Sequence, residues 1–371
     1  MTSFGTQSSA ALAGITPSSA SRSGAARWIR RLALAGLLLC FVVVILGAYV
    51  RLTAAGLGCP DWPGCYGHFT PIGAAQNEAA QAAFPGTPLH VGKAWREMVH
   101  RYAASTLGFI IVLIAALTIA GRRQRIASVP LAITLLITVV VQGFLGMLTV
   151  TWQLKPLIVT LHLLFGLTTL GLLWWLWLSL RSGQRGGVRL ASASSTSVGG
   201  YPVRQGATQR VVLVALGALA VQIALGGWTS SNYAAVACPD FPKCQNSWWP
   251  ETDYKDAFVL WRGLGVNYEG GVLQHPARVA IHFTHRLGAI VASLALIYAA
   301  FVTFRRKMKP PGAQVAAYAV LGALALQLFI GASMVLEGFP LLLATAHNGG
   351  AALLVLAAIS LYHFSRPPPA F

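Results

Sequence analysis

The 371-residue sequence has few charged side chains and is especially poor in acidic ones. Charged residues make up 10% of the chain, against roughly 25% in an average soluble domain. A water-soluble globule of this composition would lack a polar surface, which excludes a soluble enzyme and a disordered protein. The net charge of +18 does not indicate a nucleic-acid partner, because the basic residues punctuate long apolar runs and form no patch. With 56% hydrophobic residues, the composition predicts a protein that crosses a lipid bilayer several times.

Eight apolar runs are long enough to cross the membrane. A helix rises about 1.5 Å per residue, so a hydrocarbon core of about 30 Å takes about 20 apolar residues. Lipid leaves unpaired main-chain groups unsatisfied, so each run should be helical. The sequence therefore predicts an all-α polytopic membrane protein with eight transmembrane helices. They are expected at residues 32–50, 98–120, 130–150, 157–180, 211–230, 277–303, 313–335 and 341–363.

The distribution of charge between the loops predicts the orientation. Alternate loops carry clusters of Arg and Lys without any acid, whereas all nine acids lie in the other loops or at helix ends facing them. Short cytoplasmic loops retain Lys and Arg, so the basic loops should be cytoplasmic and both termini should lie inside. The net charge then reflects topology and contact with anionic lipid.

The apolar runs divide into two halves of four helices each. Residues 32–180 form the expected N-terminal half and residues 211–363 the C-terminal half. The Gly/Ser-rich stretch 181–210 is typical of a flexible cytoplasmic linker, and residues 364–371 form a short cytoplasmic tail. Residues 1–31, rich in Ser, Ala and Arg, are predicted to be a disordered cytoplasmic tail, with a mitochondrial presequence as the alternative.

The two halves are copies of one unit. The segment GCPDWPGC in the first half matches ACPDFPKC in the second, with the same spacing of the cysteines. Later in each half a constant offset of 185 residues relates four pairs, which are His100 and His285, Gln142 and Gln327, Gly146 and Gly331, and His162 and His347. The chain is therefore a duplicated four-helix unit, and both copies run in the same sense because an even number of spans separates them.

Four histidines occupy matching places in this repeat. His100, His162, His285 and His347 are expected in the first turns of helices that all run from outside to inside. A lone intramembrane His is more often a hydrogen-bonded packing residue, but polar groups repeated in register are functional candidates. Two facing imidazoles suit a metal ion or the axial positions of a haem. No further ligand repeats at that depth, so a haem in each half is favoured.

Small residues near these histidines would let a flat macrocycle lie between helices, although close helix packing is an equal alternative. These residues are Gly108, Gly166, Gly288, Gly349 and Gly350.

Three further residues beside the histidines are candidates for the site. Arg101 and Arg286 directly follow two of them and are expected either to bind haem propionates or to anchor phospholipid headgroups. Glu97 lies on the same helical face as His100, and its counterpart in the second half is His282. A carboxylate in one half alone suggests that the first half performs chemistry while the second handles electrons. The alternative is a Glu that merely caps the start of a helix.

The paired cysteines lie in loops on the outer side. Cys59 with Cys65, and Cys238 with Cys244, are expected to form two structural disulfides in this oxidising location. A redox role for the first pair is an alternative, and zinc binding is disfavoured because two further ligands are missing.

Together these motifs resemble the haem A synthase family. The resemblance rests on RLTAAGLGCPDWPGC after the first helix, EMVHR, TLH, HFTHR and ATAHN, and covers nearly the whole chain after the tail. It implies an eight-helix enzyme of the bacterial inner membrane that oxidises the C8 methyl group of haem O to the formyl group of haem A. The paired cysteines in both halves resemble the bacterial branch, which disfavours the mitochondrial presequence.

The resemblance also assigns roles to the candidate residues. It implies that His100 and His162 flank the substrate haem O, that His285 and His347 ligate a resident haem b, and that Glu97 is needed for activity. Oxygen would come either from O₂, after one axial ligand departs, or from water, after oxidation at the ring edge. The implied partners are the farnesyltransferase that makes haem O, the cytochrome oxidase assembly machinery and an unidentified electron acceptor or donor. The alternative functions are a bis-His cytochrome b-type quinol electron carrier and a non-catalytic haem-handling assembly factor.

Overall fold

The computed structural model describes residues 19–124, 126–189, 205–306 and 312–366. Regular structure in these ranges is helical, and two isolated β-bridges lie in loops. Eight helices are long and apolar enough to span a membrane, which confirms the eight predicted spans. They are α1 (Ser19–Leu52), α4 (Val91–Ala120), α5 (Val129–Thr151), α6 (Pro156–Arg189), α7 (Gln205–Ser231), α9 (His275–Phe304), α10 (Ala313–Leu336) and α11 (Leu341–Ser365).

Short helices occur in the connections between the long ones. They are α2 (Pro71–Ala75), α3 (Glu78–Ala82) and α8 (Tyr254–Ala257), with the 3₁₀ turns η1 (Arg122–Gln124) and η2 (Ala235–Ala237). Most have a polar residue as their N-cap: Thr70 for α2, Asn77 for α3 and Asp253 for α8 each accept a main-chain N–H.

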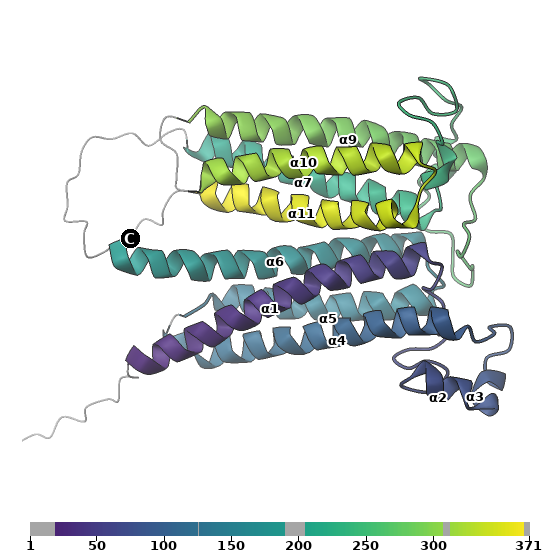
Figure 1. Cartoon of the computed structure of the whole chain (residues 1–371), viewed down its shortest axis with the longest axis horizontal. Helices are drawn as coiled ribbons and strands as arrows, with labels where there is room; N and C mark the ends of the chain where they lie inside the picture. Colours follow the sequence, from purple (N-terminus) through teal and green to yellow (C-terminus); the bar gives the residue numbers. More distant parts are fainter. Residues whose placement is uncertain (1–18, 125, 190–204, 307–311, 367–371) are drawn as a thin grey trace, which may run out of the picture.

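Each half is a closed ring of four long helices. In the first half α1 and α5 each contact α4 and α6, and in the second half α7 and α10 each contact α9 and α11. The halves meet where α6 packs on α7 and α11 and where α1 packs on α11. Figure 1 shows the long helices running along a common direction, with α2, α3 and the long loops of both halves at one end.

Two cations, Arg51 and Lys155, join the halves at the end that carries the long loops. Arg51, at the end of α1, donates to the carbonyl of Ser230 at 2.7 Å and lies 4.0 Å from the ring centroid of Tyr233. Lys155, which is 1% exposed, donates to the carbonyl of Gly263 and lies 3.2 Å from the ring centroid of Trp261. These contacts tie the first half to the end of α7 and to the loops of the second half.

The helices extend beyond the expected boundaries. The helix α1 begins at Ser19, so residues 19–31 are helical and not a disordered tail, while residues 1–18 lie outside the described residues. The expected linker is shortened at both ends, because α6 continues to Arg189 and α7 begins at Gln205. A helix satisfies its own main-chain hydrogen bonds, so it need not end where the hydrocarbon core ends. The rest of the linker (190–204) and residues 367–371 are not described.

Two matching disulfide loops lie at the end that carries the long loops. Cys59 bonds to Cys65 and Cys238 to Cys244, each pair with a Cα–Cα distance of 4.7 Å, as the spacing of the cysteines predicts. In each loop the second cysteine also forms an isolated antiparallel β-bridge with the residue three positions later, Cys65 with His68 and Cys244 with Ser247.

The aspartate of each Cys-Pro-Asp segment closes its loop. The Asp61 carboxylate accepts the main-chain N–H groups of Tyr66 and Gly67 at 2.6 and 2.8 Å. Asp240 accepts the equivalent groups of Gln245 and Asn246 at 2.8 and 2.9 Å. The repeat in sequence is therefore a repeat of one hydrogen-bonded turn.

Candidate functional site

The four histidines lie on four different helices, two in each half. His100 is on α4, His162 on α6, His285 on α9 and His347 on α11. Each lies about 9 to 15 Å along its helix from the first residue, in the second or third turn, which agrees with the prediction that they lie in the first turns.

Within each half the two imidazoles are close enough to interact electrostatically, His100 with His162 and His285 with His347. Three of the four rings have an Nδ1 atom that is buried without a hydrogen-bond partner, in His100, His162 and His347. Buried ring nitrogens without partners are the atoms that a metal centre would engage. Among the described residues no three His, Cys, Asp or Glu side chains form a group that could hold a metal ion. Two imidazoles alone fit the axial positions of a haem better than a bare ion.

Each histidine packs against a glycine of the long helix that precedes its own in the chain. A Cβ atom built on the glycine would lie 3.0 to 3.2 Å from the imidazole Cε1 atom. The glycines are Gly47 for His100, Gly146 for His162, Gly226 for His285 and Gly331 for His347. Because even Ala at these positions would crowd the ring, the four glycines set how closely the paired helices approach.

The five glycines predicted to make room for the macrocycle differ in their surroundings. Nothing lies within 4 Å of a Cβ on Gly108, and a Cβ on Gly349 would meet only Ile45. Gly166, Gly288 and Gly350 instead lie against glutamine side chains. Room for a macrocycle beside these glycines stays a prediction.

Three glutamines contact three of the histidines. Gln222 Nε2 lies 3.0 Å from His285 Nδ1, Gln327 Nε2 lies 3.2 Å from His347 Nε2, and Gln142 Nε2 lies 3.4 Å from His162 Nε2. The repeat indicated two of them, but Gln222 was missed. A lone amide within an apolar run is itself a signal, since polar residues in a span face the interior of the bundle.

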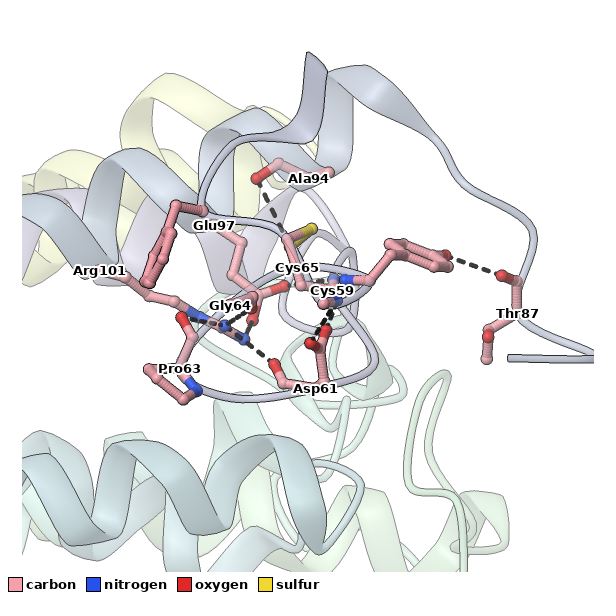
Figure 2. Close-up of a disulfide and its surroundings, with 12 residues drawn as sticks. Cys59, Asp61, Pro63, Gly64, Cys65, Thr87, Ala94, Glu97 and Arg101 are labelled. Atoms are coloured by element: carbon pink, nitrogen blue, oxygen red, sulfur yellow. Dashed lines mark hydrogen bonds and ion pairs between the residues drawn. A yellow bond between two sulfur atoms is a disulfide. The ribbon is translucent and has the colours of Figure 1, made fainter. Parts of the chain in front are cut away.

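Glu97 is a buried carboxylate in the first half, and it is 4% exposed. Its Oε2 atom accepts the main-chain N–H of Cys59 at 2.9 Å, and its Oε1 atom forms an ion pair with Arg101 (Figure 2). The helix α4 begins at Val91, so Glu97 is beyond its first turn and the alternative of a helix cap is wrong. The site thus holds a paired carboxylate one turn before His100.

The two arginines of the repeat are bound to the disulfide loops. Arg101 Nη1 donates to the main-chain carbonyls of Asp61, Pro63 and Gly64 at 2.9, 3.2 and 2.5 Å. The sequence did not indicate this role, because it depends on how the loop folds back over α4.

Arg286 does the same in the second half. It donates to the carbonyls of Lys243 and Cys238 at 2.6 and 2.9 Å, and its Nε lies 3.2 Å from His282 Nε2. His282 therefore takes the place of Glu97 as the partner of the arginine. Binding of haem propionates by Arg101 and Arg286 stays a prediction.

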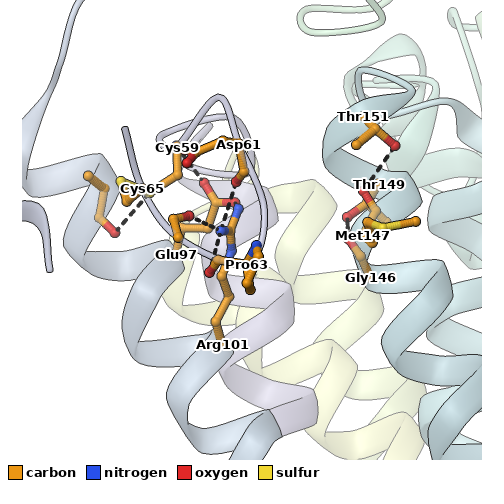
Figure 3. Close-up of polar contacts among 12 residues, drawn as sticks. Cys59, Asp61, Pro63, Cys65, Glu97, Arg101, Gly146, Met147, Thr149 and Thr151 are labelled. Carbon is orange, nitrogen blue, oxygen red and sulfur yellow. Dashed lines mark hydrogen bonds and ion pairs between the residues drawn. A yellow bond between two sulfur atoms is a disulfide. The ribbon is translucent and has the colours of Figure 1, made fainter. Parts of the chain in front are cut away.

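Figure 3 shows the Glu97 cluster together with the last turns of α5. Thr149 and Thr151 donate their hydroxyl groups to the α5 carbonyls of Gly146 and Met147, at 2.7 and 3.2 Å. Such bonds satisfy hydroxyl groups within their own helix. The polar cluster around Glu97 is thus built from α4 and the disulfide loop 59–65.

Comparison with known proteins is consistent with this arrangement. A family model described as cytochrome oxidase assembly protein matches residues 30–359. A haem A synthase of Shewanella oneidensis is 41% identical over 341 residues, which cover 91% of this chain and 96% of the relative. Haem A synthases of Granulibacter bethesdensis and Paracoccus denitrificans are 24% and 27% identical, over 95% and 88% of this chain and 90% and 84% of the relatives.

Proposed function

Because the chain belongs to the haem A synthase family, we propose that it oxidises the C8 methyl group of haem O to the formyl group of haem A, for use in terminal cytochrome oxidases. A haem A synthase is an oxidoreductase that binds haem. The eight spanning helices make this chain a multi-pass membrane protein. Its location in this proposal is the bacterial inner membrane, in line with its bacterial relatives.

The first half holds the substrate haem O, between His100 and His162. The observation that carries this assignment is the asymmetry of the repeat: a buried carboxylate, Glu97, stands one turn before His100, and His282 stands at the matching place before His285. A site that only passes electrons has no need of a carboxylate, whereas oxidation of a methyl group must also remove protons.

Glu97 serves as the proton acceptor of the reaction. Conversion of a methyl to a formyl group with oxygen from water releases four electrons and four protons, so a base beside the substrate is required. The ion pair with Arg101 and the bond from the Cys59 N–H hold the carboxylate in place at the outer end of α4. The same carboxylate can stabilise positive charge that develops on the substrate.

The second half holds a resident haem b, between His285 and His347. A bound haem b supplies one-electron transfer. The chain's own contribution there is two imidazoles held by neighbouring amides and glycines, with His282 in place of a carboxylate.

The partners follow from the substrate and the product. Haem O comes from its synthase, the protohaem farnesyltransferase, and haem A passes to the cytochrome oxidase assembly machinery. The electrons leave through an acceptor that the chain does not identify. A bis-His cytochrome b-type quinol carrier or a non-catalytic haem-handling factor would share the imidazoles, but neither accounts for Glu97 in one half alone.

The substitution Glu97→Gln tests this function. The full chain is expressed with a supply of haem O, and the haems are extracted and separated by chromatography. We expect the variant to retain bound haem and to lose at least 95% of haem A formation, since removal of a general base costs about 10²- to 10⁴-fold in rate. Glu78→Gln, which alters an exposed glutamate of α3, is the matched control and should be active. Unchanged haem O from the natural chain would refute the enzyme, and full haem A yield from Glu97→Gln would refute the role of Glu97.

A further inference from the structure

Three of the four histidines share one local arrangement, and His100 departs from it. On α5, α7 and α10 a glutamine precedes by one turn the glycine that packs on the imidazole, as Gln142 precedes Gly146, Gln222 precedes Gly226 and Gln327 precedes Gly331. On α1 the glycine is Gly47, and the residue one turn before it is Val43. His100 therefore lacks the amide that contacts each of the other three rings.

Two of the three amides are fixed by more than their contact with the ring. Gln142 Nε2 donates to the main-chain carbonyl of His162 at 2.9 Å, and Gln222 Nε2 donates to that of His285 at 3.0 Å. One nitrogen thus contacts both the main chain and the ring of the same histidine. This double contact holds the imidazole at one orientation relative to its helix.

A second difference on the histidine helices matches the first. The glutamines lie over a glycine about one turn after each histidine: a Cβ on Gly288 would meet Gln222 Oε1 at 2.4 Å, and one on Gly350 would meet Gln327 Oε1 at 2.2 Å. On α4 the residue that matches Gly288 is Ala103. At the same place after His162 the chain has Phe165, and Gln142 lies against Gly166, the next residue. Compared with His285 of the second half, His100 therefore lacks both the glutamine and the glycine beneath it.

No side-chain amide fixes the ring of His100, and its hydrogen-bond partner is the main chain of Val43. Its Nδ1 atom is buried without a partner, as are those of His162 and His347, so the missing amide is what sets His100 apart. The partners of a metal-ligating histidine fix the orientation of its ring and strengthen it as a ligand. The second half has two amide partners of this kind and the first half has one.

We propose that Gln142, Gln222 and Gln327 are positioning residues for the imidazoles of His162, His285 and His347, and that His100 is the exchangeable axial ligand of the substrate haem. This inference rests on the proposed function, since it assumes a haem in each half. Two fixed axial ligands help to retain a resident haem. A substrate haem must enter and its product must leave, which is easier when one axial ligand can dissociate.

Carbon monoxide tests the inference, because it binds ferrous haem only where an axial ligand gives way. The full chain is purified with haem in both halves and reduced with dithionite, and bound CO is measured from the difference spectrum as CO per haem. One double variant, Val43→Gln with Ala103→Gly, installs the amide at His100. Its mirror variant, Gln222→Val with Gly288→Ala, removes the amide from His285.

We expect the natural chain to bind CO at one of its two haems. Installing the amide should lower this binding at least fivefold, and removing it from His285 should raise binding towards two CO per chain. Equal CO binding in all three proteins at two haems per chain overturns the inference and leaves the proposed function intact. If the natural chain purifies without haem, both the proposed function and the inference fail. Since each double variant alters a different half, misfolding of one leaves the other as the test.

Discussion

At the scale of single residues, the glycine beside each histidine limits what the site can hold. The ideal Cβ positions of Gly146, Gly226 and Gly331 lie 3.0 to 3.2 Å from an imidazole carbon, which is closer than ordinary van der Waals contact. A larger side chain must displace the ring or separate the helices. Because packed interiors tolerate added volume poorly, either displacement costs about 1–3 kcal/mol.

The substitution Gly331→Leu should therefore remove the haem of the second half. The leucine would push the imidazole of His347 out of its place against α10, and one axial ligand would be lost. Haem per chain, measured by the pyridine haemochrome assay, should fall at least to half of its normal value. Gly322→Leu is the control, since Gly322 lies on the same helix and nothing is within 4 Å of its Cβ position. Equal loss of haem in both variants would point to a general defect of α10.

The sequence identified the histidines but not what surrounds them. The constant offset of 185 residues between the halves was enough to select His100, His162, His285 and His347. Such an offset is visible in the sequence and does not depend on how the helices pack. The contact of Gln222 with His285, and the contact of Gly226 with the same imidazole, depend on which faces of α7 and α9 meet. Helix packing sets those faces. What lies beside Gly108 depends on helix packing in the same way.

At the scale of elements, the eight helices followed from length and hydropathy, while their ends did not. Hydropathy reports the apolar part of a helix only, so α1 and α6 extend past the predicted limits. In the disulfide loops the local residues were visible in the sequence, but the contact that holds each loop was not. Their cysteines and the closing aspartates repeat in sequence, yet the arginine that clamps each loop lies on a separate helix about 40 residues away in the chain.

Each loop should loosen when its own arginine is removed. In Arg286→Gln the loop 238–244 loses donors to the Lys243 and Cys238 carbonyls, and each hydrogen bond from a charged group contributes about 1.5–3 kcal/mol. We expect the Cys238–Cys244 disulfide to be reduced about tenfold faster by a membrane-impermeant phosphine, as measured by maleimide labelling of the freed thiols.

The Cys59–Cys65 pair in the same molecule is the internal control, because Arg101 still holds its loop. If both pairs in Arg286→Gln are reduced at the rate seen in the unaltered chain, the arginine does not clamp the loop. If both are reduced faster, the substitution acts on the whole fold.

At the scale of the whole molecule, the two copies lie side by side with the same orientation. Figure 1 places the long loops of both halves at one end of the helices. The cations Arg51 and Lys155 join the halves at that end. Both disulfides, both arginine clamps and Glu97 therefore lie at the same end. The other end carries the last residues of α4 and α9, which are followed by Arg122 and Arg305.

This polarity makes a prediction about topology, because the basic end should face the cytoplasm. A green fluorescent protein fused after Phe371 should fluoresce, and alkaline phosphatase fused at the same place should be inactive, since it needs the oxidising exterior to form its own disulfides. Phosphatase inserted after Glu78, in the exposed helix α3, should be active. An active phosphatase at the C-terminus would place the cysteine pairs in the reducing cytoplasm, and the two disulfides would then lack the environment that maintains them.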